Sequence, residues 1–316
     1  MTVIKFNRLE DQLMTHPLRT LTEEQELEAK INPLVKEVYI CALDEVKKAY
    51  GQRLQASYLL GSLVHGGFSP GISDIDVSFI LKGDEITPAD WDTFDTIRQT
   101  VRETTKYGNK LSLFWSSLNI LTTRVASGAV PTWTRENGVF PPYDVLDLIQ
   151  NGLFLDGEDV RDRLKRPTVD DLYVNNVEFL LSILPTEEKQ RSIMDKSYYS
   201  QLDDRDTSKL ILLPSRLQYT LFTGKVGNNE DAALHYMDNL PKEAREAITA
   251  LVDHSLRLRD GKPRDTTLLT EHFPAIRKMY QRLIELHIRK MDELGRQDYA
   301  DRLKEWHDNC IPRLLN

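Results

Sequence analysis

The pair Gly61-Ser62, followed after a glycine-rich connection by Asp74-Ile75-Asp76, constrains the fold of this chain more than any other segment. An apolar run ends in the Gly-Ser pair, as at the end of a buried strand. From Asp74 onward polar and apolar residues alternate, which is the period of a strand and puts both aspartates on one face. We therefore predict two strands joined by a turn, with a pair of carboxylates at the start of the second strand.

These residue types suit a site for phosphate transfer. Two carboxylates two residues apart on a strand offer oxygen ligands to a hard cation such as Mg2+. A serine that begins a helix offers its hydroxyl and free backbone N–H groups to a phosphate. Together they predict metal-assisted transfer from a nucleoside triphosphate. The alternative is a glycine-rich hairpin turn with solvent-facing aspartates.

The segment resembles the signature of the polymerase-β-type nucleotidyltransferase superfamily, in which a strand, Gly-Ser and a short connection precede Asp-x-Asp on the next strand. Gly61, Ser62, Asp74 and Asp76 stand at the signature positions. The resemblance implies that ATP is a co-substrate and that Asp74 and Asp76 are catalytic residues that bind Mg2+. It also implies that Gly61 and Ser62 bind the nucleotide phosphates.

A second segment, residues 213–241, resembles the aminoglycoside adenylyltransferases that modify streptomycin and spectinomycin. The matching residues are Arg216, Tyr219, Thr220, Leu221, Thr223, Gly224, Ala232, Ala233, Leu240 and Pro241. The resemblance implies that Arg216 contacts the triphosphate, with a surface salt bridge as its alternative. It further implies that Asp203 and Asp206 face a cationic substrate, with a helix-capping loop as the alternative.

The chain departs from the superfamily at the third core strand, which we expect at residues 110–115. Relatives place a third carboxylate there, but this chain has no Asp or Glu between Glu103 and Glu136. Lys110 and Ser112 occupy the polar face of the expected strand, so we predict that one of them takes the position of the missing acid.

A general base would then have to come from water, from phosphate, or from another part of the chain. Asp156 and Asp206 are the candidates that the sequence offers. A catalytically weakened protein is the open alternative.

The fold class follows from a change of periodicity along the chain. Strand and helix patterns mix up to residue 166, with a helix expected over 22–50 and a short final strand before Gly157. Beyond Pro167 the pattern is helical throughout, and His287 sits on the clearest apolar stripe, as a core histidine would. We predict an α+β protein: a nucleotidyltransferase domain over residues 1–166, with a small mixed sheet and helices, then an all-helical domain over 167–316 that binds substrate and clamps the nucleotide.

The composition of the chain limits the classes of partner that it can be expected to bind. The chain has 316 residues and a formal net charge of -8. The acidic balance disfavours work on nucleic acid, because binding phosphates needs a basic surface, and it suits a neutral or cationic small molecule. No apolar run approaches the length of a membrane span, and two cysteines are too few for a disulfide framework. We therefore expect a cytoplasmic protein that does not enter a membrane, and the sequence leaves its oligomeric state open.

The leading prediction is an adenylyltransferase that moves AMP from Mg-ATP to a hydroxyl of a small molecule, with an aminoglycoside-like aminocyclitol as the best candidate acceptor. One alternative keeps the chemistry but modifies RNA or a protein. The other is a catalytically weak nucleotide-binding module with a regulatory role, which the missing third carboxylate would explain.

Overall fold

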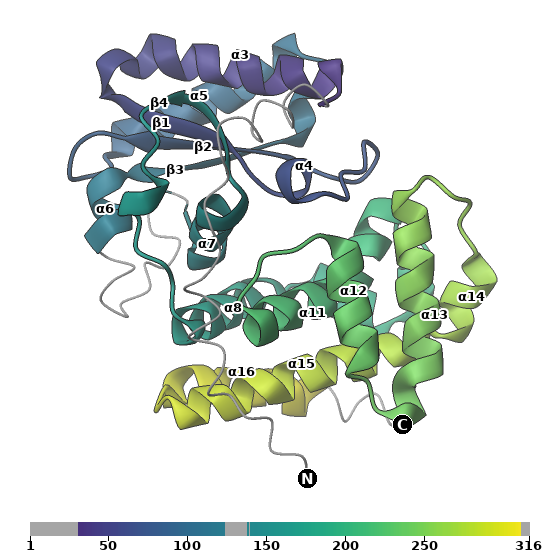
Figure 1. Cartoon of the computed structure of the whole chain (residues 1–316). Helices are drawn as coiled ribbons and strands as arrows, with labels where there is room; N and C mark the ends of the chain where they lie inside the picture. The colour runs from purple at the N-terminus through teal and green to yellow at the C-terminus, as the bar shows by residue number, and fades with distance from the viewer. Residues whose placement is uncertain (1–30, 124–137, 139, 311–316) are drawn as a thin grey trace. The chain divides into compact units, whose positions relative to one another are not determined.

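The computed structural model describes residues 31–123, 138 and 140–310, and the chain in it forms two compact units (Figure 1). Of the described residues, the first unit takes in those up to Phe68, those between Ser73 and Leu172, and the short segment Gly224–Val226. The predicted α+β class, with a mixed sheet followed by helices, is confirmed.

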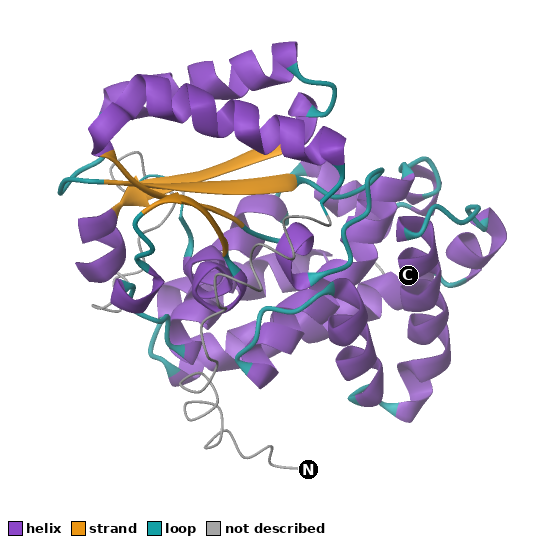
Figure 2. Cartoon of the chain, turned by 45° about the horizontal axis from the view of Figure 1, so that its top comes forward, coloured by secondary structure: helices purple, strands orange, loops and turns teal. Residues whose placement is uncertain are grey.

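A four-stranded mixed sheet lies at the centre of the first unit (Figure 2). The spatial order of its strands is β3-β2-β1-β4. Strand β1 pairs antiparallel with β2 and with β4, whereas β2 and β3 run parallel. In chain order the strands are β1 Leu54–Leu59, β2 Ile75–Leu81, β3 Leu111–Ser117 and β4 Leu153–Gly157.

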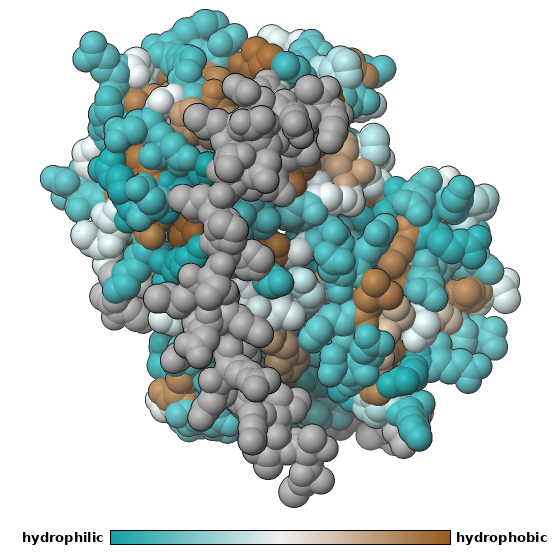
Figure 3. Space-filling view, in the orientation of Figure 1, coloured by the Kyte–Doolittle hydropathy of each residue, from teal (hydrophilic) through white to brown (hydrophobic). Residues whose placement is uncertain are grey.

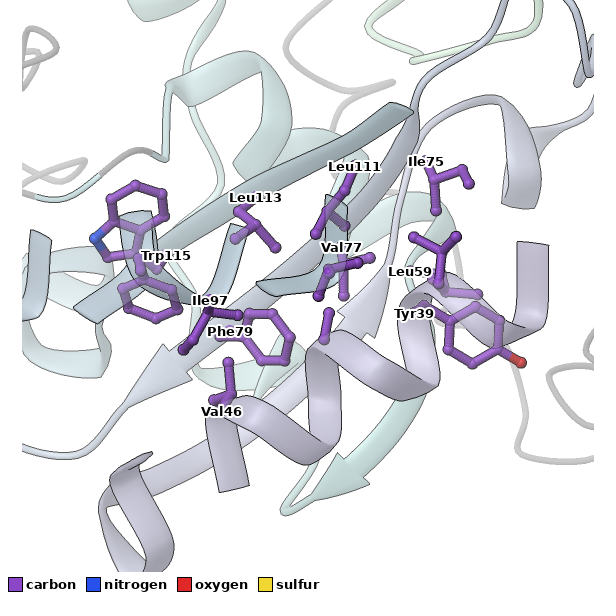
Figure 4. Close-up of a cluster of buried hydrophobic side chains, with 14 of the residues drawn as sticks. Tyr39, Val46, Leu59, Ile75, Val77, Phe79, Ile97, Leu111, Leu113 and Trp115 are labelled. Carbon is purple, nitrogen blue, oxygen red and sulfur yellow. The ribbon is translucent and has the colours of Figure 1, made fainter. Parts of the chain in front are cut away.

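Helices α3 (Pro33–Tyr50) and α5 (Pro88–Thr104) cover one face of this sheet (Figure 1). Their apolar sides meet those of the strands in a buried cluster, part of which is drawn in Figure 4. Phe94 of α5 stacks on Trp115 of β3 with ring centroids 4.5 Å apart. Removing this apolar and aromatic surface from water is the main force that holds the two helices to the sheet.

Both helices begin where the sequence supplies a cap. Thr87 caps α5 through a capping box with Asp90, and Pro88 takes the first helical position, where its missing N–H costs nothing. Asn32 caps α3 by accepting the N–H of Leu34. The helix expected over 22–50 therefore begins at Pro33, and the part of that prediction before residue 31 lies outside the described residues.

Helix α7 (Pro142–Asn151) packs on the opposite face of the sheet. A second buried cluster joins Val145 and Leu148 of α7 to Tyr58 of β1 and Ile80 of β2. Because side chains alternate along a strand, Asp76 shares this α7 face with Ile80. The sheet thus has an apolar face against α3 and α5, and a face against α7 that carries the Asp76 side chain.

The second unit is helical, and its helices carry buried apolar residues. Helix α15 contributes the most regular stripe, which includes Met279, Leu283 and the fully buried His287. The residues Ser69–Ile72 also belong to this unit, where the Ser69 hydroxyl donates to the carbonyl of Arg259 at 2.6 Å. Helix α8 (Val169–Ile183) begins in the first unit and continues into the second at Tyr173. The helices that follow are α9 Glu187–Met194, α10 Lys196–Tyr199, α11 Asp204–Thr223, α12 Asn229–Asp238, α13 Lys242–Arg259, α14 Thr266–Glu271, α15 Phe273–Glu293 and α16 Gln297–Cys310.

Hydrophilic residues dominate the face seen in Figure 3. The large apolar side chains exposed among the described residues are Ile40 and Leu234, one in each unit. None of the helices that the structure describes combines the length and the apolar character needed to cross a bilayer.

Candidate functional site

The predicted Gly-Ser turn lies at the end of β1. After the buried Leu60, Gly61 adopts φ 68° and ψ -154°, and the short helix α4 (Ser62–His65) follows. The N–H groups of Val64 and His65 both donate to the Gly61 carbonyl. A residue with a side chain rarely adopts this backbone conformation, so the turn requires glycine.

Gly61 also lies directly against one of the two predicted carboxylates. A Cβ atom on Gly61 would lie 2.1 Å from Oδ2 of Asp76. The same two segments are tied by the backbone, since the Leu60 N–H donates to the Asp76 carbonyl at 2.9 Å. The absence of a side chain at Gly61 thus leaves the space that the Asp76 carboxylate occupies.

Asp74 and Asp76 lie at the start of β2, on either side of the fully buried Ile75. The strand begins at Ile75, one residue later than the alternation predicts, so Asp74 precedes it. Both carboxylates are partly exposed, as is Ser62. The structure therefore brings Gly61, its neighbour Ser62 and the Asp pair to one end of the sheet.

The third core strand carries Ser112 next to Asp76. In the parallel ladder of β2 and β3, Ser112 is the register partner of Asp76, so their side chains share the α7 face. Of the two residues predicted for this position, Lys110 does not lie on the strand, because a 3-10 turn over Gly108–Lys110 precedes β3. Its Nζ donates to the carbonyl of Ser73 at 3.4 Å. Ser112 therefore occupies the strand position that faces Asp76.

Within the described residues, His, Cys, Asp and Glu side chains form no group of three or more that could hold a metal ion. The carboxylates that the candidate site offers to a metal ion are those of Asp74 and Asp76, both partly exposed. Two are enough for Mg2+ when substrate phosphates and water complete its coordination.

Asp156, a candidate base, is on the wrong face of the sheet. Its carboxylate pairs with Lys47 of α3 at 2.8 Å. The pairing of β1 with β4 shifts register between Ser57 and Tyr58, so that Asp156 lies opposite Ser57 and Phe154 opposite Tyr58. Asp156 thus points toward α3, while Asp76 points toward α7.

A third carboxylate that the sequence argument missed lies beneath the turn. Asp147 of α7 is 3% exposed, and its Oδ2 accepts the Gly61 N–H at 2.8 Å. An aspartate in the middle of an otherwise apolar helical run was the available signal. The sequence alone does not say which strand end this helix covers.

The remaining predicted residues belong to the second unit. Arg216 lies on α11 and is partly exposed. Asp203 precedes α11 and its carboxylate accepts the Asp206 N–H at 2.7 Å, which makes it a helix cap as the alternative predicted. Asp206 is exposed in the first turn of α11.

Among solved structures, the chain is similar to spectinomycin adenyltransferase AAD(9) from Enterococcus faecialis, whose structure contains ATP and spectinomycin. The similarity has a TM-score of 0.52 at 18% sequence identity and covers 78% of this chain and 98% of that chain. This chain has the fold of that adenyltransferase. No family model and no curated protein matches the sequence.

Proposed function

We propose that this chain is a nucleotidyltransferase that transfers AMP from Mg-ATP to a hydroxyl of a small molecule. The observation that carries the proposal is the approach of Gly61 to Asp76, with a Cβ position 2.1 Å from Oδ2. A merely structural hairpin turn has no need to place a bare backbone against a partly exposed carboxylate. The similarity of the fold to an adenyltransferase supports the same conclusion.

Each residue of the turn and of the Asp pair has a role in this proposal. Asp74 and Asp76 would hold Mg2+, and the ion when bound supplies positive charge that neutralises the phosphates. Ser62 and the backbone N–H groups at the start of α4 would bind the outer phosphates. The acceptor oxygen bonds to the α-phosphorus, the bond to the bridging oxygen breaks, and pyrophosphate leaves with its electron pair. The hydroxyl proton passes to water, because Ser112 is a poor base at neutral pH.

Arg216 is proposed as a nucleotide-binding residue on the ground of its sequence match. A guanidinium group can bind two phosphate oxygens at once, and Arg216 is partly exposed. The acceptor is proposed to be an aminocyclitol because AAD(9) was solved with spectinomycin. The net charge of -8 and the exposed Asp203 and Asp206 suit a cationic acceptor.

A second candidate function is a nucleotide-binding module with little or no turnover. The observation that favours it is Ser112, which stands beside Asp76 where a carboxylate would help bind metal or take the acceptor proton. The presence of both Asp74 and Asp76 favours an active transferase instead.

Incubation with labelled ATP and Mg2+ separates these functions. The protein is supplied in parallel with spectinomycin and other aminoglycosides, with RNA, and with a cell extract, and transfer of AMP is measured for each. Transfer to an aminoglycoside supports the proposal, and transfer to RNA or to a protein supports the alternative substrate classes. Saturable binding of Mg-ATP with no transfer to any of them supports the module.

A further inference from the structure

Asp147 is a buried carboxylate with both oxygens engaged. Oδ2 accepts the Gly61 N–H at 2.8 Å, and Oδ1 accepts the Asn151 Nδ2 at 2.8 Å. Burying a carboxylate is costly unless hydrogen bonds compensate, and bonds to a charged acceptor are stronger than neutral ones. The buried Asp147 carboxylate is thus bound directly to the backbone of the glycine in the candidate nucleotide turn.

The same end of α7 holds a second segment, Gly224–Val226, which we call the 224–226 strap. Asn151 Nδ2 donates to the Val226 carbonyl at 3.1 Å as well as to Asp147. Gln150 binds the strap at two points, donating to the Gly224 carbonyl at 2.7 Å and accepting the Val226 N–H at 2.9 Å. The strap follows α11 directly in the chain and belongs to the first unit.

These contacts form one connected network. It runs from Gly61 through Asp147 and Asn151 to the strap, with Gln150 alongside. Gly61 has no side chain of its own to fix the turn, and because it lacks a Cβ atom it can leave its observed φ of 68° for many other conformations. The hydrogen bond to Asp147 fixes the plane of the peptide that enters Gly61, and that plane sets how the glycine meets Asp76.

We propose that Asp147 and Asn151 are positioning residues: they hold the Gly61–Ser62 turn against Asp76 and anchor that arrangement to the 224–226 strap. In this proposal both residues act on the turn and not on the substrate. The inference rests on the proposed function, since the turn is taken to bind the nucleotide. Loss of Asp147 frees the turn, so Ser62 and Asp76 no longer meet the phosphates and metal together, and Mg-ATP should bind about 10- to 100-fold more weakly.

The test compares Asp147→Ala and Asp147→Asn with Asp90→Ala and Asp90→Asn. Asp90 is a matched control, because it is also 3% exposed, in the same unit, and its carboxylate accepts a backbone N–H, that of Thr87, and pairs with Arg53. Asp90 lies on α5, against the other face of the sheet. Asn151→Ala is a milder second variant that keeps Asp147 in place.

Two readouts are taken from the intact chain. Glycine-selective nitrogen labelling gives spectra of the 15 glycines, in which exchange of the Gly61 amide hydrogen reports its bond to Asp147 whether or not ATP binds. Titration with Mg-ATP then reports the consequence for the nucleotide.

In Asp147→Ala we expect faster exchange of the Gly61 amide hydrogen and weaker binding of Mg-ATP. Asp147→Asn keeps an oxygen acceptor, so its exchange rate and its Mg-ATP affinity should lie between those of Asp147→Ala and the wild type. Asn151→Ala should change both quantities in the same direction as Asp147→Ala, but less. The Asp90 variants should lose comparable stability but change neither readout.

Unchanged exchange at Gly61 in both Asp147 variants, or equal weakening of ATP binding by the Asp90 variants, would overturn the inference. If Asp147→Ala does not fold, Asp147→Asn and Asn151→Ala decide whether the inference holds. A wild-type chain that does not bind Mg-ATP overturns the proposed function, while exchange at Gly61 still decides whether Asp147 positions the turn.

Discussion

The Asp76 carboxylate lies in the space where a side chain of Gly61 would stand, with Oδ2 2.1 Å from the Cβ position. On the other side, the Gly61 N–H is bound by Asp147. Gly61 is thus required twice, by its backbone conformation and by its closeness to a carboxylate, and these two requirements can be separated by experiment.

Gly61→Ala should abolish nucleotide binding, because the new methyl group must displace either the turn or Asp76. Gly51→Ala is a matched control: Gly51 also has positive φ, at 50°, but nothing lies within 4 Å of its Cβ position. Both variants should lose about 1–3 kcal/mol of stability from backbone strain. Only Gly61→Ala should lose Mg-ATP binding, as measured by calorimetry. Equal binding by the two variants would show that the closeness of Gly61 to Asp76 is not needed for nucleotide binding.

Asp74→Asn and Asp76→Asn should each lower Mg2+-dependent transfer by roughly a hundredfold or more, as when one group that stabilises transition-state charge is removed. The fold should persist, because both side chains are partly exposed and their size is unchanged. Asp84→Asn, an exposed aspartate beyond the end of β2, controls for loss of surface charge. Steady-state rates at several Mg2+ concentrations measure the effect, and full activity in either variant of the pair would exclude a two-carboxylate metal site.

Ser112→Glu should raise the transfer rate or leave it unchanged, because it adds a carboxylate beside Asp76 at a partly exposed position. Help from a general base is commonly worth about 10²–10⁴-fold, which sets the upper limit of the gain. Lys110→Glu should not produce it, since Lys110 lies in the turn before the strand and donates to Ser73. A large loss of turnover in Ser112→Glu with ATP affinity retained would show that Ser112 itself serves the chemistry.

The helical unit should lose stability in mild acid because of His287. Burial lowers the pKa of His287 from 6.5 to about 4, and its ring packs edge-on against Tyr173. At a pH between these two pKa values, His287 takes up a proton in the unfolded chain but not in the folded chain. Stability is therefore fully present above pH 6.5 and falls by up to about 1.4 kcal/mol per pH unit as the pH drops toward 4.

His287→Phe keeps an aromatic ring and removes the titration. Thermal unfolding of both proteins at pH 7.5 and pH 5 measures the difference, since other groups that titrate contribute equally to each. The variant should lose less stability than the wild type on acidification. Equal losses would show that His287 does not titrate in this way.

Much of the fold was predictable because local rules and tertiary structure agree in it. The capped start of α5 at Thr87, the buried stripe containing His287, and the Gly-Ser turn before a strand with an Asp pair all follow from short-range patterns. Each depends on residues close in sequence, where capping and periodicity decide the outcome.

The errors lie where the outcome depends on long-range register. A register shift between β1 and β4 turns Asp156 toward α3, and strand alternation read from the sequence does not reveal such a shift. A 3-10 turn takes Lys110 off the third strand. Asp147 was missed because only the docking of α7 on the sheet brings it to Gly61. The roles proposed for Arg216 remain predictions.

The central claim is that this chain breaks ATP between its α- and β-phosphates and passes AMP to a hydroxyl. The most direct measurement compares two samples of ATP, one labelled at the α-phosphate and one at the γ-phosphate, with Mg2+ and a panel of aminoglycosides that includes spectinomycin. We predict that label from the α-phosphate appears in the acceptor, that label from the γ-phosphate appears in pyrophosphate, and that Asp76→Asn strongly slows both. Label passing from the γ-phosphate to the acceptor, or no transfer of either label to any acceptor, would contradict it.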